Sequence, residues 1–285
     1  MRITIFGSSG LLGKALMRRS GVASLTGFSS RDADIRNPAQ VDRALQESRP
    51  DWTILAAAYT DVDGCESNRD LAFATNSRGA RNVAEAASRA GSRLLFVSTD
   101  YVFDGKKGSP YEADDSRAPQ SVYGESKAEG ELQVLQVLPE CCIVRTAWLF
   151  GAGGRCFPNT ILTLAATRNE IDVVTDQRGA PTYTDDLAFA LYQLCAAGAA
   201  GIVHATNEGE CTWFDFAREI IAQRGLQTVV RPTTSDKFVR PAKRPAYSVL
   251  SLDSLHRYGI RLPSWQQALH SYLAQLDSSS DVSTA

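Results

Sequence analysis

The chain has 285 residues, of which 44% are hydrophobic and 22% are charged, and its formal net charge is −2. These values are ordinary for a soluble globular protein, and the charge gives no basic surface for nucleic acid. The sequence also has no apolar run of about 18 residues, so we expect no membrane span. The six cysteines lack C-x-x-C spacing and the three histidines lack metal-ligand spacing. We therefore expect reduced thiols, no zinc site and a cytoplasmic protein.

The first expected element is a buried strand over 3–6, followed by a glycine-rich turn and a helix over about 11–19. In this order, glycines let the backbone approach a pyrophosphate, and the helix N-terminus binds it. A tight turn without a ligand is the alternative. The flanking elements favour a dinucleotide cofactor, with contacts from Gly7, Ser9, Gly10, Leu11, Leu12 and Gly13.

The second expected strand, 23–28, leads into hydroxyl groups and a guanidinium group. An NAD enzyme commonly has an acidic residue here for the ribose 2′-hydroxyl. The pattern instead suits a 2′-phosphate and favours NADPH, although Asp32 and Asp34 follow closely and leave NADH open. A solvated loop is the other interpretation. The cofactor contacts predicted at this end are Ser29, Ser30, Arg31, Asp34 and Ile35.

Two further strands end in residues suited to a ligand site. The strand over 51–58 ends in small residues, against which a flat cofactor can lie: Ala56, Ala57 and Ala58, followed by Tyr59. A helix over 71–90 carries Asn76, which is either solvated or braces the loops above the sheet. The strand over 93–97 is followed by Thr99, Asp100 and Tyr101, where open α/β sheets bind their ligands.

Tyr123 and Lys127 are four residues apart on a helix expected over about 122–138, so they share one face. A nearby ammonium group favours the phenolate and lowers the pKa of a tyrosine, which suits an acid–base group. Such pairs also occur by chance on solvated helices. The glycine turn and the polar strand ends favour the catalytic interpretation.

The second half of the chain predicts a smaller lobe. We assign 1–150 to a dinucleotide-binding core, 151–170 and 207–276 to a substrate-binding lobe, and 277–285 to a flexible tail, with segments near 171–206 returning to the core. Trp148 ends the strand over 141–144 and is either a core residue or a stacking surface for a sugar or base. The basic segment 240–245 is either a solvated loop or an anion clamp that includes Arg244.

Together these motifs resemble the extended short-chain dehydrogenase/reductase family, within it the dTDP-4-dehydrorhamnose reductase branch. The similarity covers nearly the whole chain. Its markers are the glycine turn, Ala56–Asp63, Ser98–Gly105, Tyr123–Lys127, Arg145–Gly151, Asp176–Tyr183 and Arg244–Leu250. The resemblance implies a Rossmann-type doubly wound parallel sheet and NADPH-dependent reduction of a dTDP-linked 4-keto-6-deoxysugar. Magnesium, and a monomer or a homodimer, stay open.

The resemblance also implies roles for individual residues. Tyr123 donates a proton to the alkoxide, Lys127 lowers the Tyr123 pKa and holds the nicotinamide ribose, and Thr99 hydrogen-bonds the carbonyl oxygen. The residues that it assigns to the substrate are Thr60, Val62, Thr99, Asp100, Tyr101, Trp148 and Arg244.

Three other functions compete with reduction. A dehydratase resembling this chain has a Thr-Asp-Glu run, and here Tyr101 stands where that glutamate would supply the base. An epimerase stays open. A non-catalytic NADP-binding subunit, like the regulatory subunit of methionine adenosyltransferase, is less favoured because Thr99, Tyr123 and Lys127 are intact.

Overall fold

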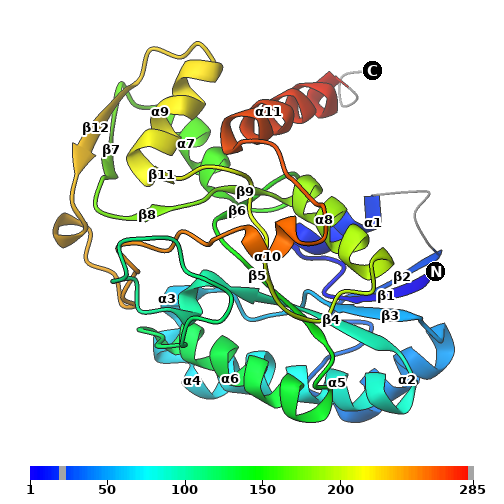
Figure 1. Ribbon diagram of the computed structural model, residues 1–285. Helices are drawn as coiled ribbons and strands as arrows, with labels where there is room; N and C mark the ends of the chain where they lie inside the picture. Colours follow the sequence, from blue (N-terminus) through cyan, green and yellow to red (C-terminus); the bar gives the residue numbers. More distant parts are fainter. Residues whose placement is uncertain (19–23, 282–285) are drawn as a thin grey trace.

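The computed structural model describes residues 1–18 and 24–281, with side chains through residue 278. Its centre is a sheet of six parallel strands in the order β10–β5–β4–β3–β1–β2 (Figure 1). The strands are β1 (Arg2–Phe6), β2 (Ser24–Phe28), β3 (Trp52–Leu55), β4 (Arg93–Thr99), β5 (Cys142–Thr146) and β10 (Gly201–His204). The predicted Rossmann-type parallel sheet is confirmed. Arg19 and Ala23, at the ends of two expected elements, lie outside the described residues.

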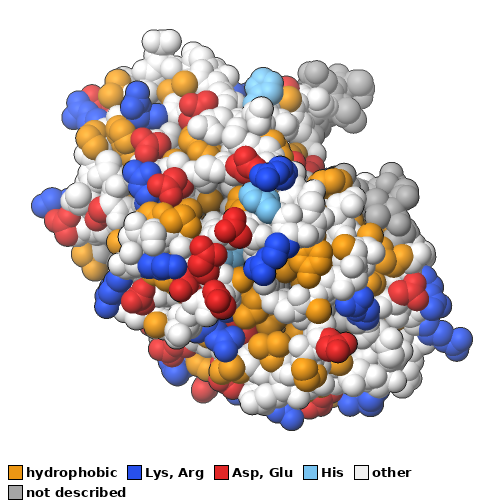
Figure 2. Space-filling model, in the orientation of Figure 1, with side chains coloured by type: hydrophobic (Ala, Val, Ile, Leu, Met, Phe, Trp, Pro, Cys, Tyr) orange, Lys and Arg blue, Asp and Glu red, His pale blue; other side chains and the backbone are white. Residues whose placement is uncertain are grey.

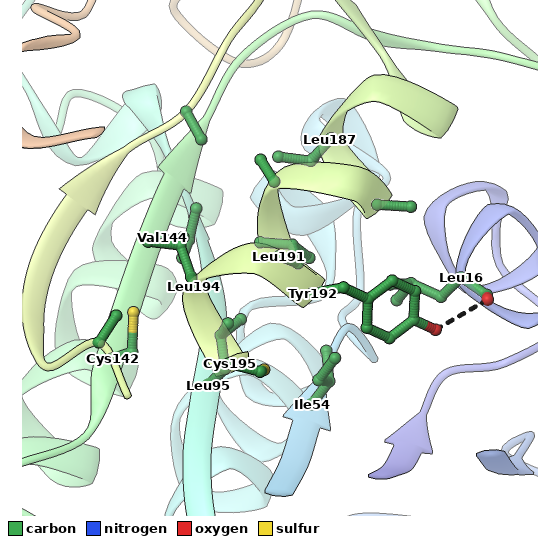
Figure 3. Close-up of a cluster of buried hydrophobic side chains, with 14 of the residues drawn as sticks. Leu16, Ile54, Leu95, Cys142, Val144, Leu187, Leu191, Tyr192, Leu194 and Cys195 are labelled. Carbon is green, nitrogen blue, oxygen red and sulfur yellow. Dashed lines mark hydrogen bonds between the residues drawn. The ribbon is translucent and has the colours of Figure 1, made fainter. Parts of the chain in front are cut away.

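Helices cover both faces of the sheet (Figure 1). Because successive strand residues point to opposite faces, Ile3 and Ile5 belong to a different buried cluster from Phe6. The first cluster includes side chains of α1 (Leu11–Arg18) and α8 (Thr184–Ala196), which the Tyr192 hydroxyl links by donating to the Leu16 carbonyl at 2.8 Å (Figure 3). The second includes side chains of α2 (Pro38–Ser48), α5 (Ala80–Arg89) and α6 (Val122–Val137).

Short helical segments surround the carboxyl ends of the central strands. They are α3 (Val62–Ser67), α4 (Arg69–Phe73), a π-helical turn η1 (Ala74–Gly79) and the 3₁₀ turn η2 (Asp100–Val102). The helix expected over 71–90 is therefore α4, η1 and α5 in succession. Ser121 begins α6 by accepting a hydrogen bond from Gly124 N through its side chain, which places Tyr123 in the first turn.

A smaller lobe follows β5. Its elements are β6 (Leu149–Phe150), α7 (Phe157–Ala165), β7 (Glu170–Val174), β8 (Arg178–Gly179), β9 (Thr182–Tyr183), β11 (Cys211–Thr212), α9 (Trp213–Gln223), β12 (Val229–Thr233), η3 (Ser235–Lys237) and α11 (Trp265–Asp281). The short helix α10 (Asp253–His256) instead lies beside β10, where His204 N donates to the Ser254 hydroxyl. We expected the segments near 171–206 to return to the core sheet. That is wrong for β7, which pairs with β12, whereas β10 pairs with β5. The boundaries at 150 and 170 stay predictions.

The last helix is longer than expected. Ser264 and Gln267 form a capping interaction at its start, since Gln267 N donates to the Ser264 hydroxyl and Ser264 N donates to the Gln267 side chain. The helix continues past Leu276 to Asp281, and Asp277 pairs with Arg224 of α9 at 2.7 Å. The flexibility predicted for the segment from residue 277 stays a prediction.

Acidic and basic side chains are interspersed on the face that Figure 2 shows. All six cysteines are buried and free. Within residues 1–18 and 24–281, the helices are either too short or too polar to cross a membrane.

Candidate active site

A cavity of about 730 Å³ opens at the carboxyl ends of the central strands. It contains residues that follow β1, β2, β3, β4 and β5, which is where parallel α/β sheets bind their ligands. The predicted site residues on its wall are Gly7, Ser9, Gly10, Leu11, Leu12, Gly13, Ser30, Asp34, Ile35, Ala56, Ala57, Ala58, Tyr59, Thr60, Val62, Thr99, Asp100, Tyr101, Tyr123, Lys127 and Trp148. Ser29, Arg31 and Arg244 do not line it.

The turn after β1 requires its glycines. Gly7 has a φ of 89°, and a Cβ atom there would lie 2.6 Å from Ala57 N. Gly13 also packs against this turn, because a Cβ atom on it would collide with the Gly7 carbonyl. The turn therefore brings bare backbone and the first turn of α1 to the cavity wall. Free amide groups at a helix N-terminus bind phosphate, so these residues fit a dinucleotide pyrophosphate.

Both carboxylates after β2 already have partners. Ser29 donates to Asp32 through its backbone nitrogen at 2.9 Å and through its hydroxyl at 2.6 Å. The Arg36 guanidinium contacts both oxygens of Asp34, and this hydrogen bonding lowers the Asp34 pKa. Both acids therefore carry hydrogen bonds from their own loop, and Arg36, which also lines the cavity, is cationic. A cationic group at this end suits a cofactor that carries a 2′-phosphate.

Asn76 braces the wall of the cavity. Its side chain accepts from Tyr59 N at 2.7 Å and donates to Tyr59 O at 3.0 Å and to the Ser126 hydroxyl at 2.9 Å. Asn76 is 1% exposed, so the interpretation of Asn76 as a brace is correct and the solvated one is wrong. Asn76 therefore fixes the loop after β3 against the helix that carries Tyr123.

Tyr123 is buried at the catalytic end of the cavity. Its ring contacts the Tyr101 ring edge to face, with centroids 5.5 Å apart. Thr99 donates to Asp100 Oδ1 at 3.0 Å and accepts from Tyr101 N at 3.2 Å. Burial raises the Tyr123 pKa, and the nearby Thr99 hydroxyl opposes this shift. The phenol is therefore protonated at neutral pH.

Lys127 is buried against β4. Its ammonium group donates to the Val97 carbonyl at 2.7 Å and lies 4.1 Å from the centroid of the Phe96 ring. Burial lowers the Lys127 pKa to about 7, against the charge of Glu131, which raises it. Burial of the phenol is the largest cause of the raised Tyr123 pKa, and the predicted effect of Lys127 on that pKa stays a prediction.

The substrate end holds a buried carboxyl group. Asp100 is 2% exposed, and burial raises its pKa to about 6. The hydroxyl groups of Ser248 and Thr99 lie beside this carboxyl group and oppose the shift. Asp100 also lines the cavity, so its carboxyl group is placed to accept a hydrogen bond from a sugar hydroxyl.

Arg244 lies beside the cavity instead of on its wall. Its guanidinium pairs with Asp63 of α3 at 3.0 Å and lies 6.0 Å from the centroid of the Tyr101 ring. The basic segment 240–245 is thus fixed against α3.

Sequence reasoning missed part of the wall: Ala33, Arg36, Leu71, Thr75, Val97, Ser98, Thr146, Ala147, Leu149 and Arg155. Val97, Ser98 and Thr146 end parallel strands, which is a usable signal. Leu71 and Thr75 come from helices, and their pattern carries no such signal. No group of three metal-ligating side chains forms within residues 1–18 and 24–281.

The parallel sheet, the glycine turn and the buried tyrosine and lysine at the strand ends define a Rossmann-type oxidoreductase of the short-chain dehydrogenase/reductase kind. More narrowly, the chain belongs to the family described as RmlD substrate binding domain, whose model matches residues 1–278.

Similar proteins align with nearly the whole chain. A dTDP-4-dehydrorhamnose reductase of Mycobacterium tuberculosis is 42% identical and aligns with 99% of this chain and 95% of its own length. A probable dTDP-4,6-dihydroxy-2-methyloxan-3-one 4-ketoreductase of Streptomyces antibioticus is also 42% identical, over 94% of this chain and 93% of its own. The crystal structure of dTDP-4-dehydrorhamnose reductase from Bacillus anthracis in complex with NADP is similar at a TM-score of 0.94 and 38% identity, over 96% of this chain and 99% of that chain.

Proposed function

We propose that this protein reduces the 4-keto group of a dTDP-4-dehydro-6-deoxysugar with NADPH, and that its substrate is dTDP-4-dehydro-β-L-rhamnose, which gives dTDP-L-rhamnose. One observation carries the proposal. The buried, protonated phenol of Tyr123 and the hydroxyl of Thr99 lie in the same cavity as the glycine turn. A reductase needs a proton donor and a dinucleotide site in one cavity.

Three regions of the wall would hold the cofactor. The glycine turn would bind its pyrophosphate, Ser30 and the segment 33–36 its adenosine, and Lys127 its nicotinamide ribose. When bound, NADPH supplies the hydride for the keto carbon. The 2′-phosphate of this adenosine would lie near Arg31 and Arg36, whose positive charges suit it.

The chain's own residues handle the proton and the substrate. Tyr123 donates a proton to the sugar oxygen as that oxygen becomes negatively charged, and Thr99 hydrogen-bonds the same oxygen. Asp100 and Tyr101 would position the sugar, Thr60 and Val62 the nucleotide side, and Arg244 the diphosphate. The phenol regains its proton from solvent after the product leaves.

A second candidate is the reduction of a dTDP-linked keto-sugar with a different ring, which the Streptomyces antibioticus relative favours by its name. An epimerase and a non-catalytic NADP-binding subunit are the remaining alternatives. The test measures NADPH oxidation against a panel of nucleotide 4-keto-sugars, with products identified by NMR. Turnover of dTDP-4-dehydro-β-L-rhamnose above the others supports the proposal. Isomerisation without NADPH oxidation indicates an epimerase, and no turnover indicates a binding subunit.

Magnesium and subunit number are tested in the same preparation. Activity after chelation with EDTA shows whether magnesium is needed, and light scattering distinguishes a monomer from a homodimer.

A further inference from the structure

Trp148 has an unusual backbone conformation. Its φ is 46°, whereas the other positive-φ residues of the described chain are glycines, apart from Arg49. A bulky side chain rarely adopts this region, because its Cβ atom crowds the backbone. Such a conformation persists only where surrounding contacts hold it, and it is common at functional sites. The contacts that hold Trp148 therefore bear on the site.

The strongest of these contacts comes from α9. The Trp148 ring stacks on the Trp213 ring, with centroids 3.5 Å apart and planes 7° apart. Phe157 packs against Trp213, with centroids 4.5 Å apart. Trp213 is itself fixed, because it begins α9 directly after the capping box formed by Thr212 and Asp215.

Gly179 supports the edge of the same indole. A Cβ atom on this residue would lie 2.5 Å from Trp148 Cε2 and 2.7 Å from Nε1. The Trp148 carbonyl also accepts a hydrogen bond from Thr182 N at 3.1 Å. The indole therefore has a stacked face, a supported edge and an anchored backbone.

Sheet register places Trp148 at the catalytic end of the cavity. Thr146 pairs with Thr99 across β5 and β4, and Trp148 follows Thr146 by two residues and lines the cavity. The adenosine end follows β2, at the far edge of the strand order. The exposed part of the Trp148 indole is thus on the side of the cavity where Thr99 would hydrogen-bond the reacting carbonyl group of the sugar.

We propose that Trp213 is a positioning residue for substrate recognition: by stacking on Trp148 it holds that indole as a rigid wall for the sugar ring of the nucleotide sugar. This inference rests on the proposed function. An aromatic face suits the apolar side of a 6-deoxysugar, and a wall fixed in advance lowers the cost of ordering it on binding.

The test uses four variants of the full-length protein. Trp213→Leu removes the stack, and Trp213→Phe keeps an aromatic ring. Gly179→Ala pushes the Trp148 indole from the other side with Trp213 intact. Trp265→Leu is the control, because it removes an indole of the same lobe that packs against Phe216. KM and kcat are measured for the dTDP-keto-sugar and for NADPH, and dTDP-L-rhamnose binding is measured by calorimetry.

We expect Trp213→Leu and Gly179→Ala to raise the KM for the sugar on the order of 10-fold and to leave the KM for NADPH unchanged. Trp213→Phe, which keeps an aromatic ring, should raise the KM for the sugar much less. Product binding should weaken in parallel, and Trp265→Leu should leave the sugar-to-NADPH ratio unchanged. Two folded variants with wild-type sugar KM overturn the inference, and so does an equal rise for NADPH. Wild-type protein that neither turns over nor binds a dTDP-sugar overturns the proposed function itself.

Discussion

The ammonium group of Lys127 donates a hydrogen bond to the Val97 carbonyl at 2.7 Å. Val97 belongs to β4, so this contact joins α6, which also carries Tyr123, to the strand that ends at Thr99. Burial shifts the pKa values of the two side chains in opposite senses. Burial lowers the Lys127 pKa to about 7 and raises that of Tyr123.

The Lys127 pKa predicts that cofactor binding depends on pH. A lysine with a lowered pKa is charged below that value and neutral above it, so affinity for the nicotinamide ribose should fall as the pH rises through about 7. NADH is the probe, since it lacks the titrating 2′-phosphate. Fluorescence titration of Lys127→Met should give weaker and pH-independent binding. Lys127→Arg keeps its charge, and a pH dependence in that variant would contradict the assignment.

Tyr123→Phe tests the proton donor. The variant keeps the ring and its packing but removes the proton, and general acids typically contribute about 10²–10⁴ in rate, so kcat should fall by that order. NADPH binding should be unchanged. Tyr101→Phe makes the same change on the neighbouring ring and should cost far less. If kcat of Tyr123→Phe stays within threefold of wild type in a chemistry-limited assay, Tyr123 is not the donor.

Local patterns predicted much of this site. Three predicted groups line the cavity: the glycines of the first turn, the alanines after β3 and the Tyr123–Lys127 pair. Each pattern could be recognised because it depends on a few neighbouring residues. Sheet order then brings them together, since parallel strands place their carboxyl ends at one edge.

Features that depend on distant partners were not predictable. The segment forming β7 reads as a strand, but nothing in its five residues specifies β12 as its partner. The direction of the Lys127 side chain depends on a carbonyl of β4, and the stack of Trp148 depends on α9. Arg36 was missed because its local sequence does not show whether the side chain is solvated or pairs with Asp34.

NADPH preference should depend on Arg31. The carboxylates of Asp32 and Asp34 are already bound, whereas Arg31 is exposed beside them. A hydrogen bond between charged groups is worth about 1.5–3 kcal/mol, so Arg31→Ala should weaken NADPH binding about 10- to 150-fold and leave NADH unchanged. Arg43→Ala, an exposed arginine of α2, is the control. Equal losses for both cofactors would show that Arg31 does not contact the phosphate.

Arg244→Ala should raise the KM for the nucleotide sugar. The Arg244 side chain is 21% exposed and lies beside Tyr101, which lines the cavity, so a diphosphate is a fitting ligand. We expect a rise of about 10-fold or more, with NADPH affinity retained. Arg240→Ala provides a matched control, because Arg240 contacts the same Asp63 at 3.6 Å but is 63% exposed. Similar kinetics for both variants would make Arg244 a surface charge.

Arg145 and Glu131 form a buried ion pair that should dominate the stability of the core. Arg145 donates to both Glu131 oxygens, at 2.9 and 2.8 Å, and their side chains are 1% and 0% exposed. Breaking this pair leaves the Glu131 charge buried with only Ser98 and the half-buried Arg117 as partners, so Arg145→Met should lower the free energy of unfolding by up to about 3–5 kcal/mol in urea titrations. The exposed pair of Arg81 and Glu85 is the control, and Arg81→Met should cost less than about 1 kcal/mol.

The stability that Arg145 contributes should depend on pH through the Glu131 pKa. Burial alone would raise the Glu131 pKa, but hydrogen bonds from Arg145, Ser98 and Arg117 outweigh it and lower the pKa. A carboxyl group with a lowered folded-state pKa contributes stability above its unfolded pKa, near about 4.3, and loses it as the pH falls through the folded value. The difference between wild type and Arg145→Met should therefore be full at neutral pH and shrink in acid. A difference that stays constant into strong acid would mean that Arg145 stabilises the fold by packing, with no contribution from the charge of Glu131.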